Sequence, residues 1–460
     1  MKHQTLLFSL LLVLASSLRA QERPEERYRY LDPSTPVSHD PRRVPVPEEA
    51  VDASVLVLSG GRIFSATGAD VSEGNVVLRG SSIEAILPPS RRDWPADAEV
   101  IDVRGKTVLP GLVDLHTHLT YVDPDTSPER NRSVADSTLR ALERLRYYVE
   151  SGITSIRDVA SAGDVPFVLK QWVAEDRIPG PRIFAAGSLI TATGGHGAEG
   201  GNELTESSAV VTASGPDEWR EAVRRQFDKG ADLIKLASHF SREEIRAAVE
   251  EAHALGLRVT VDAETFYVAW AIEAGVDSVE HPLPRTEEAV RLMAERGVAS
   301  VPTLVPYILI IDSAGGYFGS TSRRFTMTKE SNLAMLETLR KAGVKIGVGT
   351  DLVLDWYRYL PEAYITELKQ LVAVGLTEKE ALLAATRDSA EILDMGHLLG
   401  TLEKGKLADV LVVDGRPDET LDDLARVDLV IRNGTVVVRG GRISVPRHQV
   451  RERTNEKPSW

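Results

Sequence analysis

The sequence of 460 residues contains no cysteine. This absence excludes disulfide bonds, thiolate metal ligands, a cysteine nucleophile and a lipid-anchored lipoprotein form. Positive charge is also limited, because 54 Lys and Arg residues stand against 68 Asp and Glu residues, for a net charge of −14. No basic stripe or Lys/Arg-rich block interrupts this balance, so the composition argues against a nucleic-acid partner.

An apolar run long enough to span a bilayer is also missing near the N-terminus, where the run from Leu6 to Leu14 falls short of the ~20 residues needed. Lys2 precedes this run and small residues follow it, a pattern typical of a secretory signal peptide over residues 1–20. We therefore expect a secreted or periplasmic protein without a stable membrane anchor after cleavage. An uncleaved anchor is the alternative.

The two ends of the chain have similar β-rich texture, with short apolar runs separated by glycines. Asn433-Gly434 predicts a two-residue hairpin turn in the C-terminal part. The simplest interpretation is one small composite β-sandwich built from residues 53–110 and 400–446. A polar, Pro-rich lead-in (21–52) and a polar tail (447–460) flank these segments.

Residues 111–399 alternate short apolar runs with helical patterns, such as 242–256 and 332–343, which both end at a glycine. Eight such strand–helix units predict an α/β fold, specifically a (β/α)₈ TIM barrel. A doubly wound open sheet is the alternative. It is disfavoured because no Gly-rich phosphate-binding fingerprint follows the first strand.

Candidate metal ligands gather at the predicted strand ends, which in a barrel form the catalytic face. His116 and His118 are two residues apart in "PGLVDLHTHLT", so their side chains point to one face of a strand. The other strand-end candidates are Lys235, Asp262, His281 and Asp351. Imidazole and carboxylate groups suit Zn²⁺ and similar divalent ions. The alternatives are a hydrogen-bonded core histidine at 281, a helix cap at 351, and an ion pair of Lys235 with Asp351 or Asp262.

Longer motifs give a family resemblance over roughly residues 53–445. They are "VIDVRGKTVLPGLVDLHTHL", "GITSIRDVAS", "TGGHG", "GADLIKLAS", "AIEAGVDSVEHP", "VGTD" and "GTLEKGKLADVLVVDG". The chain resembles the amidohydrolase superfamily, in the group that includes imidazolonepropionase-type and Xaa-Pro or Xaa-Arg dipeptidase-type enzymes.

The resemblance implies a centre for two divalent ions and hydrolysis by a metal-activated hydroxide. One ion would be held by His116, His118, Asp351 and a carbamate on Lys235, and the other by the second carbamate oxygen and residues of strands five and six. Asp351 would transfer the proton to the leaving nitrogen. His196, in the "GGHG" segment, would polarise the substrate carbonyl, and a flexible glycine loop without a catalytic role is the alternative.

The sequence departs from the family pattern at strand five, where Asp262 replaces the usual histidine. This replacement has three explanations. Asp262 ligates the second ion, which is the favoured explanation; the second ion site is weak or empty; or the protein has lost the activity and kept the fold. Glu264 and His239 lie close to the same strand ends and are candidate substrate-binding residues, although a surface role for His239 is equally consistent. Carboxylates at 262 and 264 would favour a cationic group on the substrate.

The combined prediction is a metal-dependent hydrolase that cleaves a C–N (amide or peptide) bond of a small peptide-like substrate, in the manner of a dipeptidase. It would contain one or two divalent ions per chain, with Zn²⁺ expected, and a carbamate on Lys235. The alternatives are a hydrolase of a cyclic amide of the lactam or imidazolone type, and a non-catalytic binding protein. The expected partner is a dipeptide or another small molecule. Assembly into a homo-oligomer is left open.

Overall fold

The computed structural model of the chain describes residues 53–122, 133–198, 209–314 and 327–445. The predicted signal peptide, lead-in and tail therefore lie outside the described residues.

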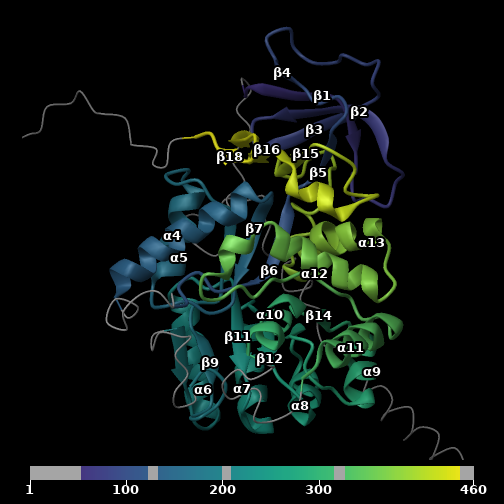
Figure 1. Cartoon of the computed structure of the whole chain (residues 1–460). Helices are drawn as coiled ribbons and strands as arrows, with labels where there is room; N and C mark the ends of the chain where they lie inside the picture. Colours follow the sequence, from purple (N-terminus) through teal and green to yellow (C-terminus); the bar gives the residue numbers. More distant parts are fainter. Residues whose placement is uncertain (1–52, 123–132, 199–208, 315–326, 446–460) are drawn as a thin grey trace, which may run out of the picture.

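Both ends of the described chain contribute to one nine-stranded sheet (Figure 1, purple and yellow). Its order is β18-β17-β16-β15-β5-β1-β2-β3, and β4 pairs with β1. The join is the antiparallel pair of β5 and β15, where Val108 faces Val412. The strands are β1 (Val55–Ile63), β2 (Ser72–Arg79), β3 (Ser82–Leu87), β4 (Glu99–Asp102), β5 (Thr107–Pro110), β15 (Val410–Val413), β16 (Val427–Arg432), β17 (Thr435–Arg439) and β18 (Arg442–Ile443).

The predicted hairpin at Asn433-Gly434 is confirmed. Arg432 pairs with Thr435 across it, and the two turn residues have φ of 47° and 74°. Two successive left-handed residues give the turn the twist that neighbouring antiparallel strands require.

The middle of the chain forms parallel strands, which confirms the α/β class. They are β6 (Leu112–Thr117), β7 (Ile153–Asp158), β8 (Arg182–Ala185), β9 (Leu189–Thr191), β10 (Val210–Thr212), β11 (Leu233–Ala237), β12 (Arg258–Asp262), β13 (Ser278–Glu280) and β14 (Ala299–Val301). One sheet has the order β6-β7-β8 and another β10-β9-β11-β12-β13-β14. Most of these residues are buried, as expected for parallel strands with covered faces.

Backbone hydrogen bonds also connect the two parallel sheets. Asp232 N donates to Ala185 O at 2.9 Å, which links the start of β11 to β8. At the other side, Ser300 of β14 forms a parallel bridge with Ile346, and Leu115 N of β6 donates to Val348 O at 2.8 Å. The segment 345–350 therefore lies between β14 and β6.

This segment was predicted as an eighth strand, "KIGVGTD", but it forms only the single bridge at Ile346. Its glycines permit close packing. A Cβ atom on Gly347 would lie 2.5 Å from Leu115 Cδ1, and one on Gly349 would lie 2.7 Å from His116 Cβ. At Gly349 the nearby atoms include the backbone nitrogen of His116 at 3.0 Å, so the backbone of this segment approaches β6 too closely for a side chain at that position.

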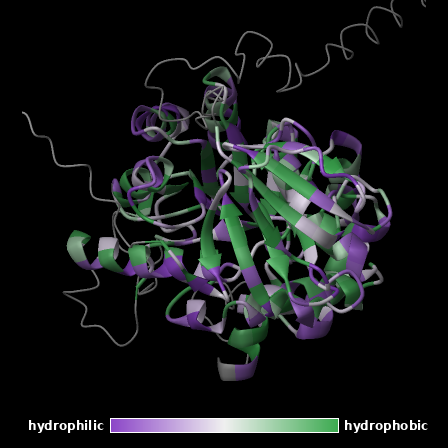
Figure 2. Ribbon diagram, turned by 90° about the horizontal axis from the view of Figure 1, so that it is seen from above, coloured by the Kyte–Doolittle hydropathy of each residue, from purple (hydrophilic) through white to green (hydrophobic). Residues whose placement is uncertain are grey.

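Helices connect and cover the parallel strands (Figure 1). The described α-helices include α4 (Val134–Glu150), α5 (Val165–Ala174), α6 (Pro216–Asp228), α7 (Arg242–Ala254), α8 (Phe266–Ala274), α9 (Glu287–Arg296), α10 (Leu304–Ala314), α11 (Lys329–Lys341), α12 (Glu362–Ala373), α13 (Glu378–Leu383) and α14 (Ser389–Ile392). Figure 2 shows hydrophobic residues concentrated on the central strands and hydrophilic ones on the outer helices.

Both predicted helices are present. α7 begins after a capping box formed by Ser241 and Glu244, and α11 begins at Lys329, three residues before the predicted start. Each helix is followed by a left-handed glycine, Gly256 or Gly343.

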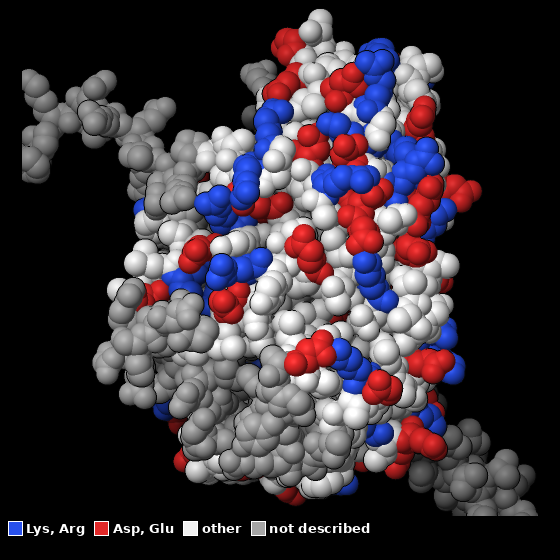
Figure 3. Space-filling view, in the orientation of Figure 1, with Lys and Arg blue, Asp and Glu red and all other residues white. Residues whose placement is uncertain are grey.

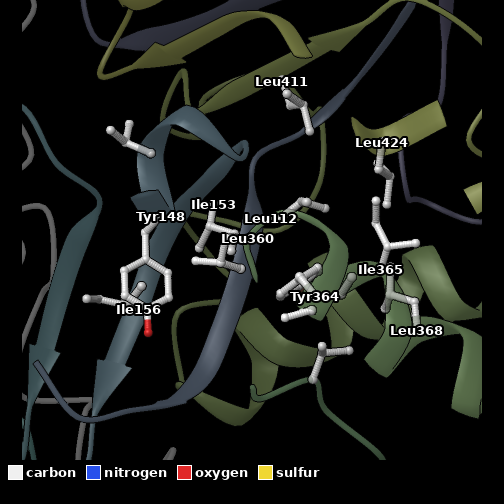
Figure 4. Packing of buried hydrophobic residues seen from close by; sticks show 14 of the residues in the cluster. Leu112, Tyr148, Ile153, Ile156, Leu360, Tyr364, Ile365, Leu368, Leu411 and Leu424 are labelled. Carbon is white, nitrogen blue, oxygen red and sulfur yellow. The ribbon is translucent and has the colours of Figure 1, made fainter. Parts of the chain in front are cut away.

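A large apolar cluster joins the parallel strands to the sheet made from the chain ends (Figure 4). It includes Leu112 of β6, Tyr148 of α4, Tyr364 of α12 and Leu411 of β15. The two regions share one continuous hydrophobic core, so β6, which carries His116 and ends just before His118, is packed on several sides.

The described surface carries both signs of charge. On the face in Figure 3, Lys and Arg side chains alternate with Asp and Glu side chains. In the part of the chain that is described, none of the helices combines the length and the apolar character that crossing a membrane requires.

Candidate metal centre and active site

Side chains from the carboxyl ends of the parallel strands meet in one cavity, which is open to solvent. It contains seven of the predicted site residues: His116, His118, His196, Lys235, Asp262, His281 and Asp351. The strand order therefore brings together residues that are up to 235 positions apart in the sequence.

Three ligand atoms converge on one side of the cavity. His116 Nε2 lies 3.2 Å from His118 Nε2, and Asp351 Oδ1 lies 3.5 Å and 3.2 Å from these two atoms. His116 Nδ1 donates to Glu280 Oε2 at 2.7 Å, and His118 Nδ1 donates to the carbonyl oxygen of Ala160 at 3.0 Å. In neutral rings both Nε2 atoms then carry lone pairs.

Burial lowers the pKa of His116 to about 3, which keeps this ring neutral. In the neutral tautomers that donate through Nδ1, two imidazole lone pairs and a carboxylate oxygen face one another. Such an arrangement is repulsive unless a cation lies at its centre.

The spacing fits a divalent ion. Ligand atoms at about 2.0–2.1 Å from zinc are about 3.3 Å apart in a tetrahedron. The observed separations of 3.2 to 3.5 Å agree with that geometry. Ligand atoms of His116, His281 and Asp351 also lie within 4.8 Å of one another, so His281 is close to the same group.

Asp262 is the centre of a second cluster. Its Oδ2 atom lies 3.1 Å from His196 Nε2 and 3.2 Å from His281 Nε2. Burial opposes ionisation, but the contacts with the His281 and His196 imidazoles prevail and hold the pKa of Asp262 well below its usual range. A carboxylate thus occupies the position where the family resemblance predicts an imidazole, and it faces the cavity.

Lys235 lies on β11 with a buried side chain that lines the cavity. Among the described residues, its Nζ atom has no hydrogen-bond partner, so the alternative of a direct ion pair with Asp351 or Asp262 is not observed. Burial lowers the pKa of Lys235, and the carboxylates of Glu280 and Asp262 only partly oppose this effect. An uncharged amine is the form that can react with carbon dioxide.

Two of the candidate ligands occupy strained backbone positions. His281 and Asp351 have φ of 63° and 46°, in the left-handed region that non-glycine residues rarely adopt. Arg285 stabilises the strained backbone at His281 by donating a hydrogen bond to its carbonyl oxygen at 2.6 Å. Asp114 accepts hydrogen bonds from the backbone of His116 and Thr350, so it connects the starts of the two ligand-bearing segments.

The "TGGHG" segment is held in place rather than extended into solvent. His196 N donates to Ser238 O at 2.5 Å. A Cβ atom on Gly195 would lie 2.8 Å from His239 N, so glycine is needed for this close contact. The side chain of His196 remains 28% exposed and reaches the cavity.

Two candidates, Glu264 and His239, are not among the described residues that line the cavity. Glu264 is buried and accepts a hydrogen bond from Ser238 Oγ at 2.9 Å. The His239 ring instead lies near the ring of Tyr267, with 5.3 Å between the centroids. Because β12 ends at Asp262, the two-residue alternation of side chains does not continue to Glu264.

Apolar residues outside the predicted ligand set form another wall of the cavity. Tyr121 stacks on His118 with 4.0 Å between ring centroids. The other apolar lining residues are Leu189, Pro306, Tyr307, Ile310, Met327, Val353 and Trp356. Several come from the segment after β14 that the sequence shows as unusually aromatic, and α10 supplies three of them.

Comparison with known proteins identifies the family. The model of the amidohydrolase family matches residues 107–437, and the chain belongs to this family. It is 27% identical over 430 residues to a protein named ochratoxinase from Aspergillus niger, covering 84% of this chain and 87% of that one. It is also 26% identical to an imidazolonepropionase from a Geobacillus species, covering 81% of this chain and 90% of the relative.

Solved structures agree with this assignment. A prolidase complexed with N-methylphosphonate-L-proline is 31% identical, with a TM-score of 0.76, and the match covers 84% of this chain and 100% of that one. A Xaa-Pro dipeptidase with bound methionine is 29% identical, with a TM-score of 0.75 and the same coverage. Membership of the family and these relatives support an enzyme that hydrolyses C–N bonds, and the predicted group is confirmed.

Proposed function

We propose that the protein is a metal-dependent hydrolase that cleaves the amide bond of a small peptide-like substrate with an apolar side group. The observation that supports it most directly is the convergence of His116 Nε2, His118 Nε2 and Asp351 Oδ1 within 3.2 to 3.5 Å of one another. These residues, with His281, Asp262 and a carbamate on Lys235, would hold one or two divalent ions. A bound ion would supply Lewis acidity and a water nucleophile at neutral pH.

The protein side chains have separate tasks in this proposal. Asp351 lies among the ligand atoms and remains ionised, because its contacts with the His116 and His118 imidazoles outweigh the effect of burial and lower its pKa. It can therefore accept the proton of the attacking water and pass it to the leaving nitrogen. His196 reaches the cavity from a fixed loop and is suited to donate a hydrogen bond to the substrate carbonyl oxygen.

The cavity wall supports an apolar group on the substrate. Tyr307, Ile310, Met327, Val353 and Trp356 provide aromatic and aliphatic surface beside the metal ligands. The earlier expectation of a cationic group depended on Glu264, which faces Ser238 rather than the cavity, and on Asp262, which is already paired with two imidazoles. Apolar and aromatic substrates are therefore preferred in this proposal.

The architecture that supports this site is, in our proposal, a (β/α)₈ barrel over 111–399 with a composite β-sandwich from 53–110 and 400–446. The hydrogen bonds from β8 to β11, and from β14 through 345–350 to β6, support closure of the barrel. A shared apolar core containing Leu58, Val76 and Val412 supports the sandwich.

The test combines elemental analysis with a substrate library. The purified protein should carry one or two divalent ions per chain and should cleave dipeptides and N-acyl amino acids with apolar or aromatic side chains faster than acidic or basic ones. His118→Gln should lose ions and activity. The matched control His253→Gln should retain both, because His253 lies on α7 and pairs with Asp277 at 3.1 Å.

The alternatives give different results. Cleavage of cyclic amides but not linear ones would replace the dipeptidase-like assignment with a lactam or imidazolone hydrolase. Tight binding of apolar amides without turnover, in protein with full ion content, would identify a binding protein. Failure of the purified protein to retain any divalent ion would contradict the proposal as a whole.

A further inference from the structure

Behind the metal ligands lies a buried charge pair that the proposed chemistry does not use directly. Glu280, the last residue of β13, and Arg157 of β7 are 0% and 3% exposed. Arg157 Nη2 donates to Glu280 Oε1 at 2.7 Å. Charged groups this deeply buried are costly unless they are paired and hydrogen-bonded.

The second oxygen of Glu280 contacts a ligand. Glu280 Oε2 accepts the hydrogen bond of His116 Nδ1 at 2.7 Å. Its first oxygen is also bonded by the hydroxyl of Thr260, on β12. The carboxylate is thus fixed on one side by Arg157 and Thr260 and presents its other oxygen to the ring of His116.

Arg157 also fixes the backbone that carries this ring. Its Nε donates to the carbonyl oxygen of Leu115 at 2.5 Å, and its Nη1 donates to Ser278 Oγ at 3.2 Å. One guanidinium therefore connects β6, immediately before His116, to β13, which carries Glu280. The backbone position and the ring orientation of His116 depend on the same group.

This arrangement selects one of the two neutral forms of the imidazole. A hydrogen on Nδ1 is required for the bond to Glu280, and the lone pair must then lie on Nε2, which is the atom directed at His118 and Asp351. With the hydrogen on Nε2 instead, the ring would point an N–H at the place of the ion.

We propose that Glu280, held by Arg157 and Thr260, is a positioning residue that keeps His116 in the tautomer and orientation required for metal ligation through Nε2. The inference rests on the proposed function, because it concerns the same ion. Carboxylates that orient metal-bound histidines in this way typically contribute 10- to 100-fold to metal affinity.

The experiment measures Zn²⁺ affinity of the metal-stripped full chain by competition with a chromophoric chelator. Glu280→Gln should bind Zn²⁺ about 10- to 100-fold more weakly than the wild type. Thr260→Val, which keeps the carboxylate but removes one hydrogen-bond donor, should show a smaller loss in the same direction. Asp409→Asn is the matched control, since Asp409 is a buried carboxylate paired with Arg182 at 3.2 Å, away from the cavity lining.

A spectroscopic measurement separates positioning from general destabilisation. In ¹⁵N-histidine-labelled metal-free protein, the wild-type His116 ring should carry its hydrogen on Nδ1, and Glu280→Gln should increase the Nε2–H form. The His116 signals are identified by their loss in His116→Gln. A control variant that only weakens the fold, such as Asp409→Asn, should leave this tautomer unchanged.

The outcomes distinguish the two proposals. If the wild type binds Zn²⁺ while Glu280→Gln and Thr260→Val bind it equally tightly and keep the Nδ1–H form, the positioning role is wrong and the proposed function stands. If Glu280→Gln does not fold, unchanged affinity in Thr260→Val overturns the role. If the wild type itself fails to bind Zn²⁺ or another divalent ion, the proposed function fails first.

Discussion

Removal of the carboxyl group of Glu367 should loosen the first turn of α10, the helix that provides part of the cavity wall. Glu367 lies on α12 and is fully buried. Its two oxygens accept hydrogen bonds from the backbone N–H groups of Leu304 and Val305, both at 2.9 Å. These are N–H groups of the first turn of a helix, which have no partner within the helix itself.

The size of the effect follows from these two bonds. Leu304 and Val305 are 1% and 3% exposed, so water cannot readily replace a lost acceptor. A buried donor without a partner costs about 1–3 kcal/mol, and Glu367→Ala leaves two of them, for a loss of about 2–6 kcal/mol. Glu367→Gln keeps one acceptor oxygen and should lose less.

The most direct assay is hydrogen exchange at the amides of residues 304 and 305, together with chemical unfolding. Glu367→Ala should lower protection at these amides and raise the KM for apolar substrates, because Pro306, Tyr307 and Ile310 follow on the same helix. Glu362→Ala, an exposed change at the start of α12, is the control and should leave both measurements unchanged. Normal protection at 304 and 305 in Glu367→Ala would refute the reasoning.

The same residue gives a pH dependence. Burial raises the pKa of Glu367 from 4.5 to about 8, although the two backbone N–H donors oppose this. Because the folded-state pKa is raised, the contribution of Glu367 is complete below about pH 4.5 and is lost as pH rises through about 8, a change of roughly 5 kcal/mol. The stability advantage of the wild type over Glu367→Ala should therefore decrease between pH 5 and 9. An advantage that grows with pH would contradict this sign.

Substitutions at Lys235 and Asp262 test the proposed metal centre, and one measurement tests the predicted signal peptide. Lys235→Ala should lower divalent-ion content and rate, and bicarbonate or short carboxylic acids should partly restore both; full ion content in the variant would exclude a ligand role. Asp262→Ala should lose ions, whereas Asp262→His should retain them and move the acidic limb of the pH–rate profile to lower pH, because a neutral ligand replaces a negative one. Unchanged ion stoichiometry and rate in Asp262→Ala would remove Asp262 from the ligand set. N-terminal sequencing of the native protein should show loss of about the first 20 residues, and cytoplasmic protein that retains Met1 would contradict export.

Most of the cavity's polar residues could be predicted because they share one structural rule. His116, Asp262, His281 and Asp351 stand at or just beyond the carboxyl ends of parallel segments, and those ends meet on one side of the fold. The rule applies only as far as the strand extends, because side chains no longer alternate regularly beyond its end. Glu264 lies only two residues after Asp262, but the chain has already turned, and its carboxylate faces Ser238.

The supporting charges could not be assigned from sequence. Arg157, Glu280 and Glu367 are visible as charges inside apolar segments, which suggests buried pairing, but each partner is distant in the chain. Arg157 and Glu280 are separated by 123 positions. Only the folded structure shows that Glu280 contacts the candidate ligand His116. It also shows that Glu367 accepts hydrogen bonds from the first turn of α10.

The charges around the cavity would limit the number of divalent ions in the proposed metal centre. Asp262, Asp351 and Glu280 are three carboxylates in or next to the site, and the contact with Arg157 neutralises Glu280. With neutral imidazoles and an uncharged Lys235, two negative charges remain, which one divalent ion balances. A carbamate on Lys235 adds a third negative charge, and in a buried site that charge is stable only if a further cation compensates it. Carbamate formation and occupancy by a second ion should therefore depend on each other, so removal of bicarbonate should reduce the content of divalent ions from two per chain toward one.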